Sequence, residues 1–210
     1  MIQQRKDEVT DYDPPIDRTQ ELMGYEKPNR LKDIIEWLRT IVFALLFAII
    51  IMFFFTPTIV KEHSMEPNFS ENDYVILSKK AYEFFGDPKR GDVIVFKSHI
   101  PLENGEKNHN KLLIKRVIGV PGDTIDINNG KVFVNGTELK EDYISVDYTL
   151  GNVVDKKVGK NQYFCLGDNR PVSLDSRSGT VGMVSRDSIV GKAVLRLLPM
   201  KKMGLIKNPF

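Results

Sequence analysis

The sequence has almost no cysteine: Cys165 is the single one among 210 residues. One cysteine cannot form an internal disulfide, so packing and hydrogen bonds must hold the fold together. It stands in the apolar run YFCLG, and a free cysteine in such a run is typically buried and inert. The chain is therefore expected either in the cytosol or outside a cell that does not rely on disulfides.

An excess of one charge is also absent, because 30 Lys and Arg residues balance 28 Asp and Glu residues to a formal net charge of +2. This near-neutral balance gives no reason to expect a nucleic-acid partner. The sequence contains no glycine-rich phosphate-binding loop, and its three histidines, His63, His99 and His109, lack metal-ligand spacing. We therefore expect no metal and no cofactor, and we expect the histidines on the surface.

Charge is missing altogether from residues 40–60, which read TIVFALLFAIIIMFFFTPTIV. About 20 helical residues span the hydrocarbon core of a bilayer, which is roughly 30 Å thick. A cleaved export signal fits poorly, since the segment starts far from Met1 and ends in bulky phenylalanines. A buried core helix is usually shorter and carries a polar stripe. The segment therefore predicts one transmembrane helix over residues 40–60.

Basic residues flank this segment unequally. Only Lys61 follows it closely, whereas four precede it: Lys27, Arg30, Lys32 and Arg39. The positive-inside rule then predicts a cytoplasmic N-terminus. Residues 1–39 form a polar, mostly flexible cytoplasmic tail in this interpretation, and residues 61–210 form an extracytoplasmic domain. The lipid bilayer is accordingly one expected partner.

The sequence beyond residue 60 is typical of a mainly β fold. Short runs of β-branched and aromatic residues, separated by glycine and aspartate, predict strands: DYVILSK, GDVIVFK, KLLIKRVIGV, DTIDI, KVFVNG, NQYFCLG and SIVGKAVLRLL. The stretch TIDINNGKVFVNG predicts a hairpin around Asn128, Asn129 and Gly130, because these residues tolerate a positive φ. AYEFF predicts one helical turn, and the polar interval 98–111 predicts a loop.

The stretch VKEHSMEPNF places Ser64 just beyond the apolar segment, and a catalytic serine needs a base within hydrogen-bond reach. His63 is adjacent, but neighbouring side chains of an extended chain point to opposite faces. In LLIKRVIG, strand alternation places Lys115 on the same face as Leu113 and Val117. Burial there would lower the lysine pKa from about 10.4, and a neutral amine would accept the serine proton. An exposed lysine that merely keeps the sheet soluble is the alternative.

Four motifs follow one another in a specific order: SMEP from Ser64, GDVIVF from Gly91, KRVIGVPGD from Lys115 and GDNRPVSLDSR from Gly167. With VGMV and IVGKA downstream, and behind a membrane anchor, they resemble the type I signal peptidases in their Gram-positive-like form. These Ser-Lys peptidases remove signal peptides from exported proteins. The resemblance extends from the membrane segment to Leu198 and implies an extracytoplasmic β-rich catalytic domain.

The resemblance implies a role for individual residues. It makes Ser64 the nucleophile, Lys115 the general base, and Ser173 the serine that hydrogen-bonds and orients the lysine. It further implies a set of supporting residues: Asp175 with Arg177 as an ion pair, Arg116 joining them, and Asp168 with Asn169 in the turn that holds this loop.

Signal peptides of exported preproteins are the substrates that the resemblance implies. The family recognises small side chains one and three residues before the cut, which shallow apolar pockets would explain. The candidate substrate-binding residues shape the cleft floor or lie near enough to contribute to these pockets: Met65, Pro67, Ile59 and Val60.

Two positions depart from the family pattern. Glu62 stands where glycine, serine or threonine is common, and Asn68 stands where threonine is common. Position 62 lies beside the expected oxyanion hole, whose chief donor would be the Ser64 backbone N–H. A carboxylate aimed at that donor would repel the oxyanion, whereas one aimed elsewhere is harmless. We predict that Glu62 points away.

Three other interpretations compete with the peptidase. The first is a signal-peptidase-like factor that assists pilus assembly, with pilin subunits as partners and weak or no proteolysis. The second is a self-cleaving Ser-Lys repressor, which the membrane segment and the lack of a DNA-binding module disfavour. The third is a β domain without chemistry, which the ordered motifs disfavour. Retention of Ser64, Lys115 and Ser173 argues for catalysis.

Overall fold

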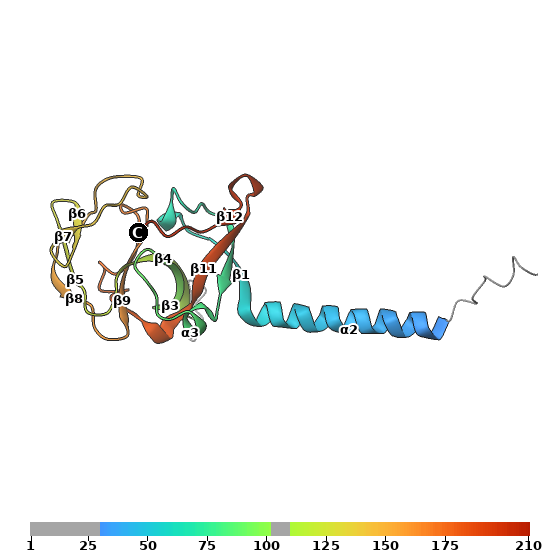
Figure 1. Ribbon diagram of the computed structural model, residues 1–210. Coiled ribbons are helices and arrows are strands. Elements are labelled where there is room, and N and C mark those ends of the chain that lie inside the picture. The colour runs from blue at the N-terminus through green and yellow to red at the C-terminus, as the bar shows by residue number, and fades with distance from the viewer. Residues whose placement is uncertain (1–29, 102–109) are drawn as a thin grey trace, which may run out of the picture. The chain divides into compact units, whose positions relative to one another are not determined.

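The computed structural model describes residues 30–101 and 110–210 (Figure 1). The chain divides into two compact units, Met1–Phe47 and Ala48–Phe210. Most of the polar tail predicted over residues 1–39 lies outside the described residues, as do His109 and the middle of the loop predicted over 98–111.

A long helix, α2, runs from Arg30 to Phe54 and is long and apolar enough to cross a membrane. Its 25 residues correspond to a length of about 37 Å. The helix differs from the one predicted over 40–60: it begins earlier, and Phe55–Ile59 forms strand β1 instead. Pro57 explains this end, since proline disfavours a helix interior but is tolerated on an edge strand, and β1 is an edge strand.

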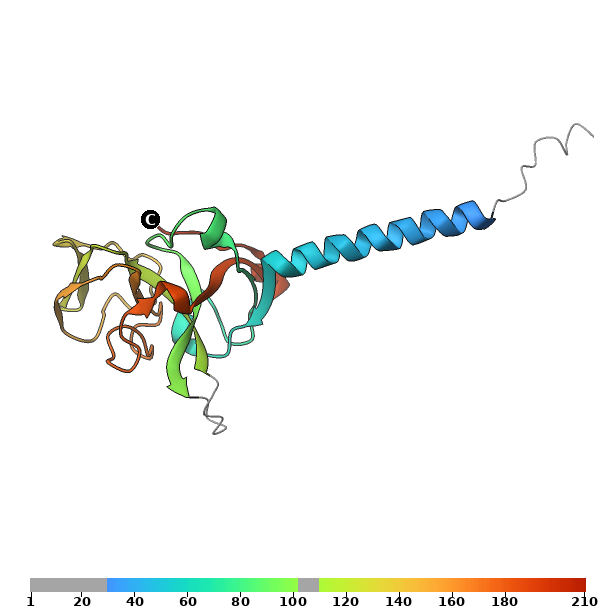
Figure 2. The ribbon, with the colours of Figure 1, turned by 90° about the horizontal axis from the view of Figure 1, so that it is seen from below.

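The larger of the two sheets in the described residues carries Lys115. Its order is β1-β2-β11-β3-β4-β9-β10, and β12 pairs with β11. The strand pairings along this path are antiparallel, and Figure 2 shows β3 and β4 running side by side. The strands are Tyr74–Ser78 (β2), Val93–Pro101 (β3), Asn110–Gly119 (β4), Gln162–Leu166 (β9), Val184–Ser185 (β10), Ile189–Leu198 (β11) and Gly204–Leu205 (β12).

The smaller sheet has the order β7-β6-β5-β8. Its strands are Thr124–Asn128 (β5), Lys131–Val134 (β6), Thr137–Glu138 (β7) and Val153–Lys157 (β8). The predicted hairpin joins β5 to β6, with φ of 49° at Asn129 and 79° at Gly130. The prediction of a mainly β domain behind one apolar helix is confirmed.

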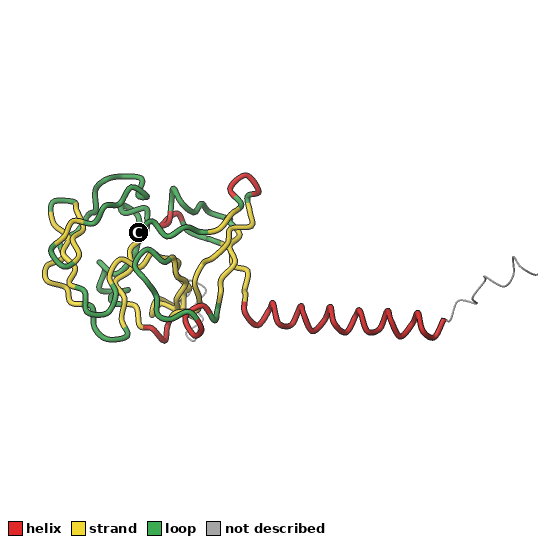
Figure 3. Tube along the Cα trace, in the orientation of Figure 1, coloured by secondary structure: helices red, strands yellow, loops and turns green. Residues whose placement is uncertain are grey.

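Helical segments within the described part of the domain are short, and loops fill much of the remainder (Figure 3). The predicted turn over AYEFF is helix α3, Ala81–Phe84. The 3-10 segments are His63–Met65 (η1), Arg186–Ser188 (η2) and Met200–Lys202 (η3). Ser64 lies in η1, so the local conformation around it is a single tight turn.

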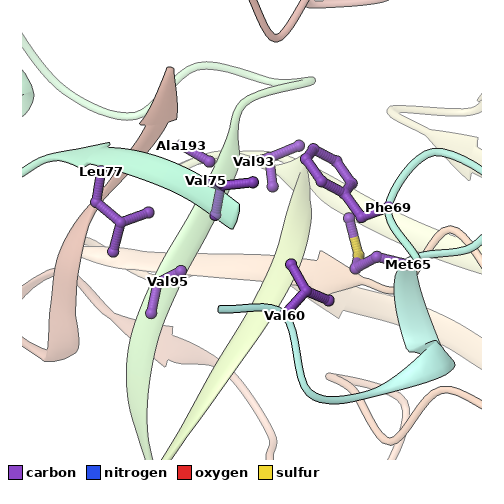
Figure 4. Packing of buried hydrophobic residues seen from close by; sticks show 8 residues of the cluster. All are labelled: Val60, Met65, Phe69, Val75, Leu77, Val93, Val95 and Ala193. Atoms are coloured by element: carbon purple, nitrogen blue, oxygen red, sulfur yellow. The ribbon is translucent and has the colours of Figure 1, made fainter. Parts of the chain in front are cut away.

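Apolar side chains anchor that turn on both sides. Val60 before Ser64, and Met65 and Phe69 after it, are buried in one cluster with residues of β2, β3 and β11. Figure 4 shows the Met65 and Phe69 side chains beside each other in this cluster. Because such packing leaves little freedom to the backbone between the anchors, the position of Ser64 is set by the hydrophobic core.

Gly191 in β11 is a position where the fold tolerates no side chain. A Cβ there would lie 2.8 Å from the Ser78 carbonyl oxygen of β2. We therefore expect Gly191→Ala to lower the free energy of unfolding by about 1–3 kcal/mol, since overpacking forces the backbone apart. Thermal unfolding of the detergent-solubilised chain measures this.

Gly204→Ala is the matched control, because no described atom lies within 4 Å of a Cβ at Gly204. It should melt like the parent. A Gly191→Ala variant that melts with this control would contradict the prediction.

Candidate active site

Ser64 is held by the loop that contains Asn169. The Asn169 backbone N–H donates to the Ser64 carbonyl oxygen at 3.0 Å, and its side-chain amide donates to the His63 carbonyl oxygen at 3.0 Å. Ser64 itself is 4% exposed. Asn169, which the sequence places in a supporting turn, thus makes two hydrogen bonds that fix the backbone at the serine.

Lys115 reaches Ser64 from the middle of β4. Its Nζ donates to Ser64 Oγ at 2.7 Å and to the Ile114 carbonyl oxygen at 2.9 Å. The lysine is 0% exposed, and Leu113 and Val117 on the same face of the strand are buried as well. The structure therefore brings together two side chains that are 51 positions apart in the chain.

Burial lowers the pKa of Lys115 below its usual range, because the apolar surroundings disfavour the charged ammonium. The carboxylates of Glu62 and Asp175 act in the opposite direction and raise this pKa. The net shift favours a neutral amine, which has a lone pair for the serine proton. Burial also raises the pKa of the Cys165 thiol, so the cysteine stays protonated, as expected for an inert core residue.

Ser173 lies close to the nucleophile but does not make the predicted hydrogen bond to Lys115. Its Oγ is buried and has no hydrogen-bond partner among the described residues. A Cβ on Gly167 would lie 2.2 Å from Ser173 Oγ and 2.4 Å from the Ser64 carbonyl oxygen. Gly167 therefore allows the two loops to approach each other, while Lys115 donates to Ser64 and Ile114 instead.

Asp175 and Arg177 form an ion pair within the loop that carries Ser173. Arg177 Nε and Nη2 each donate to one carboxylate oxygen of Asp175 at 2.8 Å. Asp175 is 0% exposed and also accepts the Gly167 backbone N–H at 3.1 Å. Because the pair is bidentate, it restrains the orientation of the two side chains and also neutralises the buried Asp175 carboxylate.

Arg116 pairs with a different carboxylate from the one predicted. It does not join Asp175 and Arg177; its Nε and Nη2 donate to Asp168 at 2.8 and 2.7 Å. The reason is strand alternation, which turns Arg116 to the face of β4 opposite Lys115. Asn68, one of the two departures from the family pattern, also donates to Asp168, at 2.9 Å.

Arg170 is a supporting residue that the sequence reasoning missed. It is 1% exposed, forms an ion pair with Glu141, and donates to Thr149 Oγ1 at 2.5 Å and to the Gly167 carbonyl oxygen at 3.0 Å. The only feature of the sequence that pointed to a supporting role for Arg170 was its position within the motif GDNRPVSLDSR. Its acidic partner lies far away in the sequence, and no local pattern points to it.

A cleft of about 370 Å³ is lined by residues that neighbour the dyad in the chain, although Ser64 and Lys115 are not among its lining residues. It lies between the chain segment 58–62 and the first residues of β4, and Ile114, next to Lys115, belongs to its wall. The lining residues are Thr58, Ile59, Val60, Lys61, Glu62, Val95, Lys111, Leu112, Leu113 and Ile114.

The four candidate substrate-binding residues divide into two pairs. Ile59 and Val60 line the cleft. Met65 is 0% exposed and packs in the core cluster with Phe69, and the exposed Pro67 lies outside the lining set. The expectation that Met65 and Pro67 shape the cleft floor is therefore corrected, because the side chain of Met65 is needed to anchor the serine turn.

Glu62 directs its carboxylate to a partner across the cleft. Its Oε1 lies 2.5 Å from Lys111 Nζ. The two described histidines have surface side chains: His63 is exposed and pairs with Glu66, and His99 is exposed on β3. The described residues contain no group of three His, Cys, Asp or Glu side chains that would hold a metal ion.

A buried, hydrogen-bonded Ser-Lys pair beside a cleft, in a β-rich domain that follows a membrane-length helix, is the arrangement expected of a serine peptidase of the Ser-Lys class. Comparison with known proteins agrees. The family model "Signal peptidase, peptidase S26" matches residues 34–198. The chain therefore belongs to the signal peptidase family, peptidase S26.

Similar proteins carry the same description. Signal peptidase I P of Bacillus subtilis subsp. natto is 35% identical over 196 residues, which cover 88% of this chain and 100% of the relative. Signal peptidase I S of Bacillus subtilis is 31% identical, covering 86% of this chain and 98% of the relative. A crystal structure of a signal peptidase I from Enterococcus faecalis is 31% identical, covers 50% of this chain and 96% of its own, and has a TM-score of 0.41.

The buried pair of Arg116 and Asp168 generates a stability prediction. Arg116→Met leaves the Asp168 carboxylate buried without its cation, and such a loss costs about 3–5 kcal/mol. Denaturant unfolding of the detergent-solubilised chain should show this loss. Lys131→Met removes the exposed pair with Asp147 and serves as the control with an unchanged midpoint. Equal midpoints for both variants would refute the prediction.

Proposed function

We propose that this chain is a membrane-bound type I signal peptidase that removes N-terminal signal peptides from exported preproteins through a dyad of Ser64 and Lys115. The observation that carries the proposal is the 2.7 Å hydrogen bond between Ser64 Oγ and a fully buried lysine. Family membership and the lowered pKa of Lys115 support the same chemistry.

Acylation follows from this geometry. Neutral Lys115 Nζ takes the proton of Ser64 Oγ as the oxygen attacks the carbonyl carbon of the scissile peptide bond. The resulting oxyanion needs a hydrogen-bond donor, and the Ser64 backbone N–H is suited to this role. It lies in the first turn of η1, where N–H groups have no intrahelical acceptor.

The intermediate collapses when protonated Lys115 gives its proton to the leaving amine, which frees the mature protein. The signal peptide is left as an ester on Ser64 Oγ. In the second half of the reaction, Lys115 takes a proton from water as the water oxygen attacks the ester carbonyl. Breakage of the ester bond then returns the proton to Ser64 and releases the signal peptide as a carboxylic acid.

Ser173 is proposed as an additional acceptor for Lys115 during this cycle. A protonated lysine has three N–H donors, and two acceptors already surround Nζ in the structure, Ser64 Oγ and the Ile114 carbonyl. The buried Ser173 Oγ lacks a partner among the described residues and packs against Gly167 beside the Ser64 backbone. An acceptor there would orient the lysine and stabilise its charged form.

The cleft suits the apolar end of a signal peptide. Its walls include the aliphatic side chains of Ile59, Val60, Val95 and Ile114, and its volume of about 370 Å³ is at the small end for ligand sites. Side chains near the cut would have to be small to enter. The two walls are extended chain segments, so an extended peptide is the substrate shape they accommodate.

The chain is a single-pass membrane protein with its catalytic domain outside. Helix α2 supplies the span, and the basic residues before its apolar part orient it with the N-terminus inside. Ser64 follows the end of α2 closely, which keeps the dyad near the outer surface where a translocated signal peptide ends. Pilus assembly with pilin subunits as partners, the alternative function, has no support in the comparisons.

Substitution of the dyad tests the function. Ser64→Ala and Lys115→Arg should each reduce preprotein cleavage by the purified full-length chain by at least about 10³-fold. Arginine keeps its charge at all accessible pH values and cannot act as a base. Lys131→Met, remote on the second sheet, should cleave like the parent. Full activity in either dyad variant would remove that residue from the mechanism.

The pH dependence tests the protonation state. Only neutral Lys115 accepts the proton, so kcat/KM should rise with pH through the lysine pKa, which burial places below the usual 10.5. The rising limb should therefore lie at lower pH than an exposed lysine would give. A rate that is independent of pH, or falls over this range, would contradict a lysine base.

A further inference from the structure

The ion pair of Glu62 and Lys111 joins the two walls of the cleft and takes no part in the mechanism above. Glu62 stands two positions before the nucleophile, and Lys111 lies on β4, on the strand that carries the base. Glu62 Oε1 and Lys111 Nζ are 2.5 Å apart, and each side chain is about one-third exposed, 35% and 33%. A partly exposed pair of this kind contributes little to stability.

Glu62 stands at the start of the 3-10 turn that contains Ser64, so its ion pair with Lys111 affects the backbone N–H groups of that turn. Glu62 is the N-cap residue of η1, with an extended backbone at φ −128° and ψ 155°. An N-cap side chain ordinarily accepts hydrogen bonds from the second or third backbone N–H of the turn, and Ser64 supplies the second. Glu62 makes no such capping bond in the described structure, because its carboxylate is directed to Lys111.

A carboxylate released from Lys111 would compete for the donor that the oxyanion needs. Glu62 stands two positions before Ser64, so a released carboxylate would be attracted to the N–H groups at the start of this turn, and a negative charge there would also repel the developing oxyanion. The loss of one oxyanion donor costs about 10²–10³ in kcat. The restraint on Glu62 therefore has a direct consequence for the reaction rate.

We propose that Lys111 is a positioning residue that holds the Glu62 carboxylate across the cleft, away from the Ser64 N–H, and so keeps the oxyanion position open. The inference rests on the proposed function of the Ser64–Lys115 dyad. It explains how this chain combines glutamate at position 62 with a peptidase site, since the lysine at position 111 compensates for the carboxylate.

The ion pair of Glu62 and Lys111 also affects the pKa of the base, Lys115. Four groups act on the pKa of Lys115 besides its burial: Glu62, Asp175 and Cys165 raise it, and Lys111 lowers it. Removing Lys111 removes the group that lowers this pKa and leaves Glu62 without its cation. The rising limb of the pH profile should then move to higher pH. Removing Glu62 should move the limb to lower pH.

The test compares four full-length enzymes in detergent with one purified preprotein: the parent, Lys111→Met, Glu62→Gln and the double variant. Lys111→Met should lose about 10–100-fold in kcat, within the limit set by one oxyanion donor, and its rising limb should move to higher pH. The double variant should recover most of this loss, because no carboxylate remains to be held. Lys131→Met controls for the loss of an exposed, paired lysine.

The possible outcomes distinguish a failure of the positioning role of Lys111 from a failure of the proposed peptidase function. A parent without cleavage at any pH would overturn the proposed function and the inference with it. An active parent with an equally fast Lys111→Met overturns the inference alone, as does a double variant as slow as Lys111→Met. Thermal unfolding shows whether Lys111→Met folds. If it does not, an unmoved rising limb in Glu62→Gln overturns the inference.

Discussion

The contact between a buried lysine amine and Ser64 Oγ is the interaction on which the site depends. A lysine ammonium has no lone pair and cannot act as a base, and burial favours the neutral amine by lowering the pKa of Lys115. The strand β4 achieves this by placing Lys115 on a face whose neighbours Leu113 and Val117 are buried in the core. The fold therefore uses the same apolar packing for stability and for activation of the base.

Two chain segments have to meet for that contact to form. The turn at Ser64 is anchored by Val60, Met65 and Phe69, and the loop from Gly167 to Arg177 is pressed against it. The absence of a side chain on Gly167 permits the approach, and the two hydrogen bonds of Asn169 fix it. The buried ion pair of Arg116 with Asp168 connects β4 to the same loop.

The two departures from the family pattern, Asn68 and Glu62, both have side chains that bind to neighbouring residues. Asn68 supplies an amide that donates both to Asp168 and to the Tyr143 carbonyl oxygen, so the side chain connects the serine turn to the supporting network. Glu62 has its carboxylate paired with Lys111. In both cases a changed side chain is matched by a hydrogen bond or an ion pair to a residue far away in the sequence.

Local sequence patterns determined the elements of this protein. Alternation and turn residues predicted the long strands, the hairpin at Asn129 and Gly130, and the face of β4 that carries Lys115, because these depend on neighbours in the chain. The apolar run did not show where α2 ends, since Phe55–Ile59 suits a helix in lipid and a strand equally. The short strands β7, β8, β10 and β12 were missed because they are polar, exposed or only two residues long.

What lies opposite each side chain was decided by the tertiary structure alone. Sequence placed Arg116 with Asp175, left Arg170 without a partner, and assigned Met65 to the cleft, whereas sheet order and packing join Arg116 to Asp168, Arg170 to Glu141 and Met65 to the core. The free energy that selects these partners comes from burial between segments remote in the chain. No local propensity contains that information, so the sequence determined which residues carry the chemistry and only the tertiary structure decided how they meet.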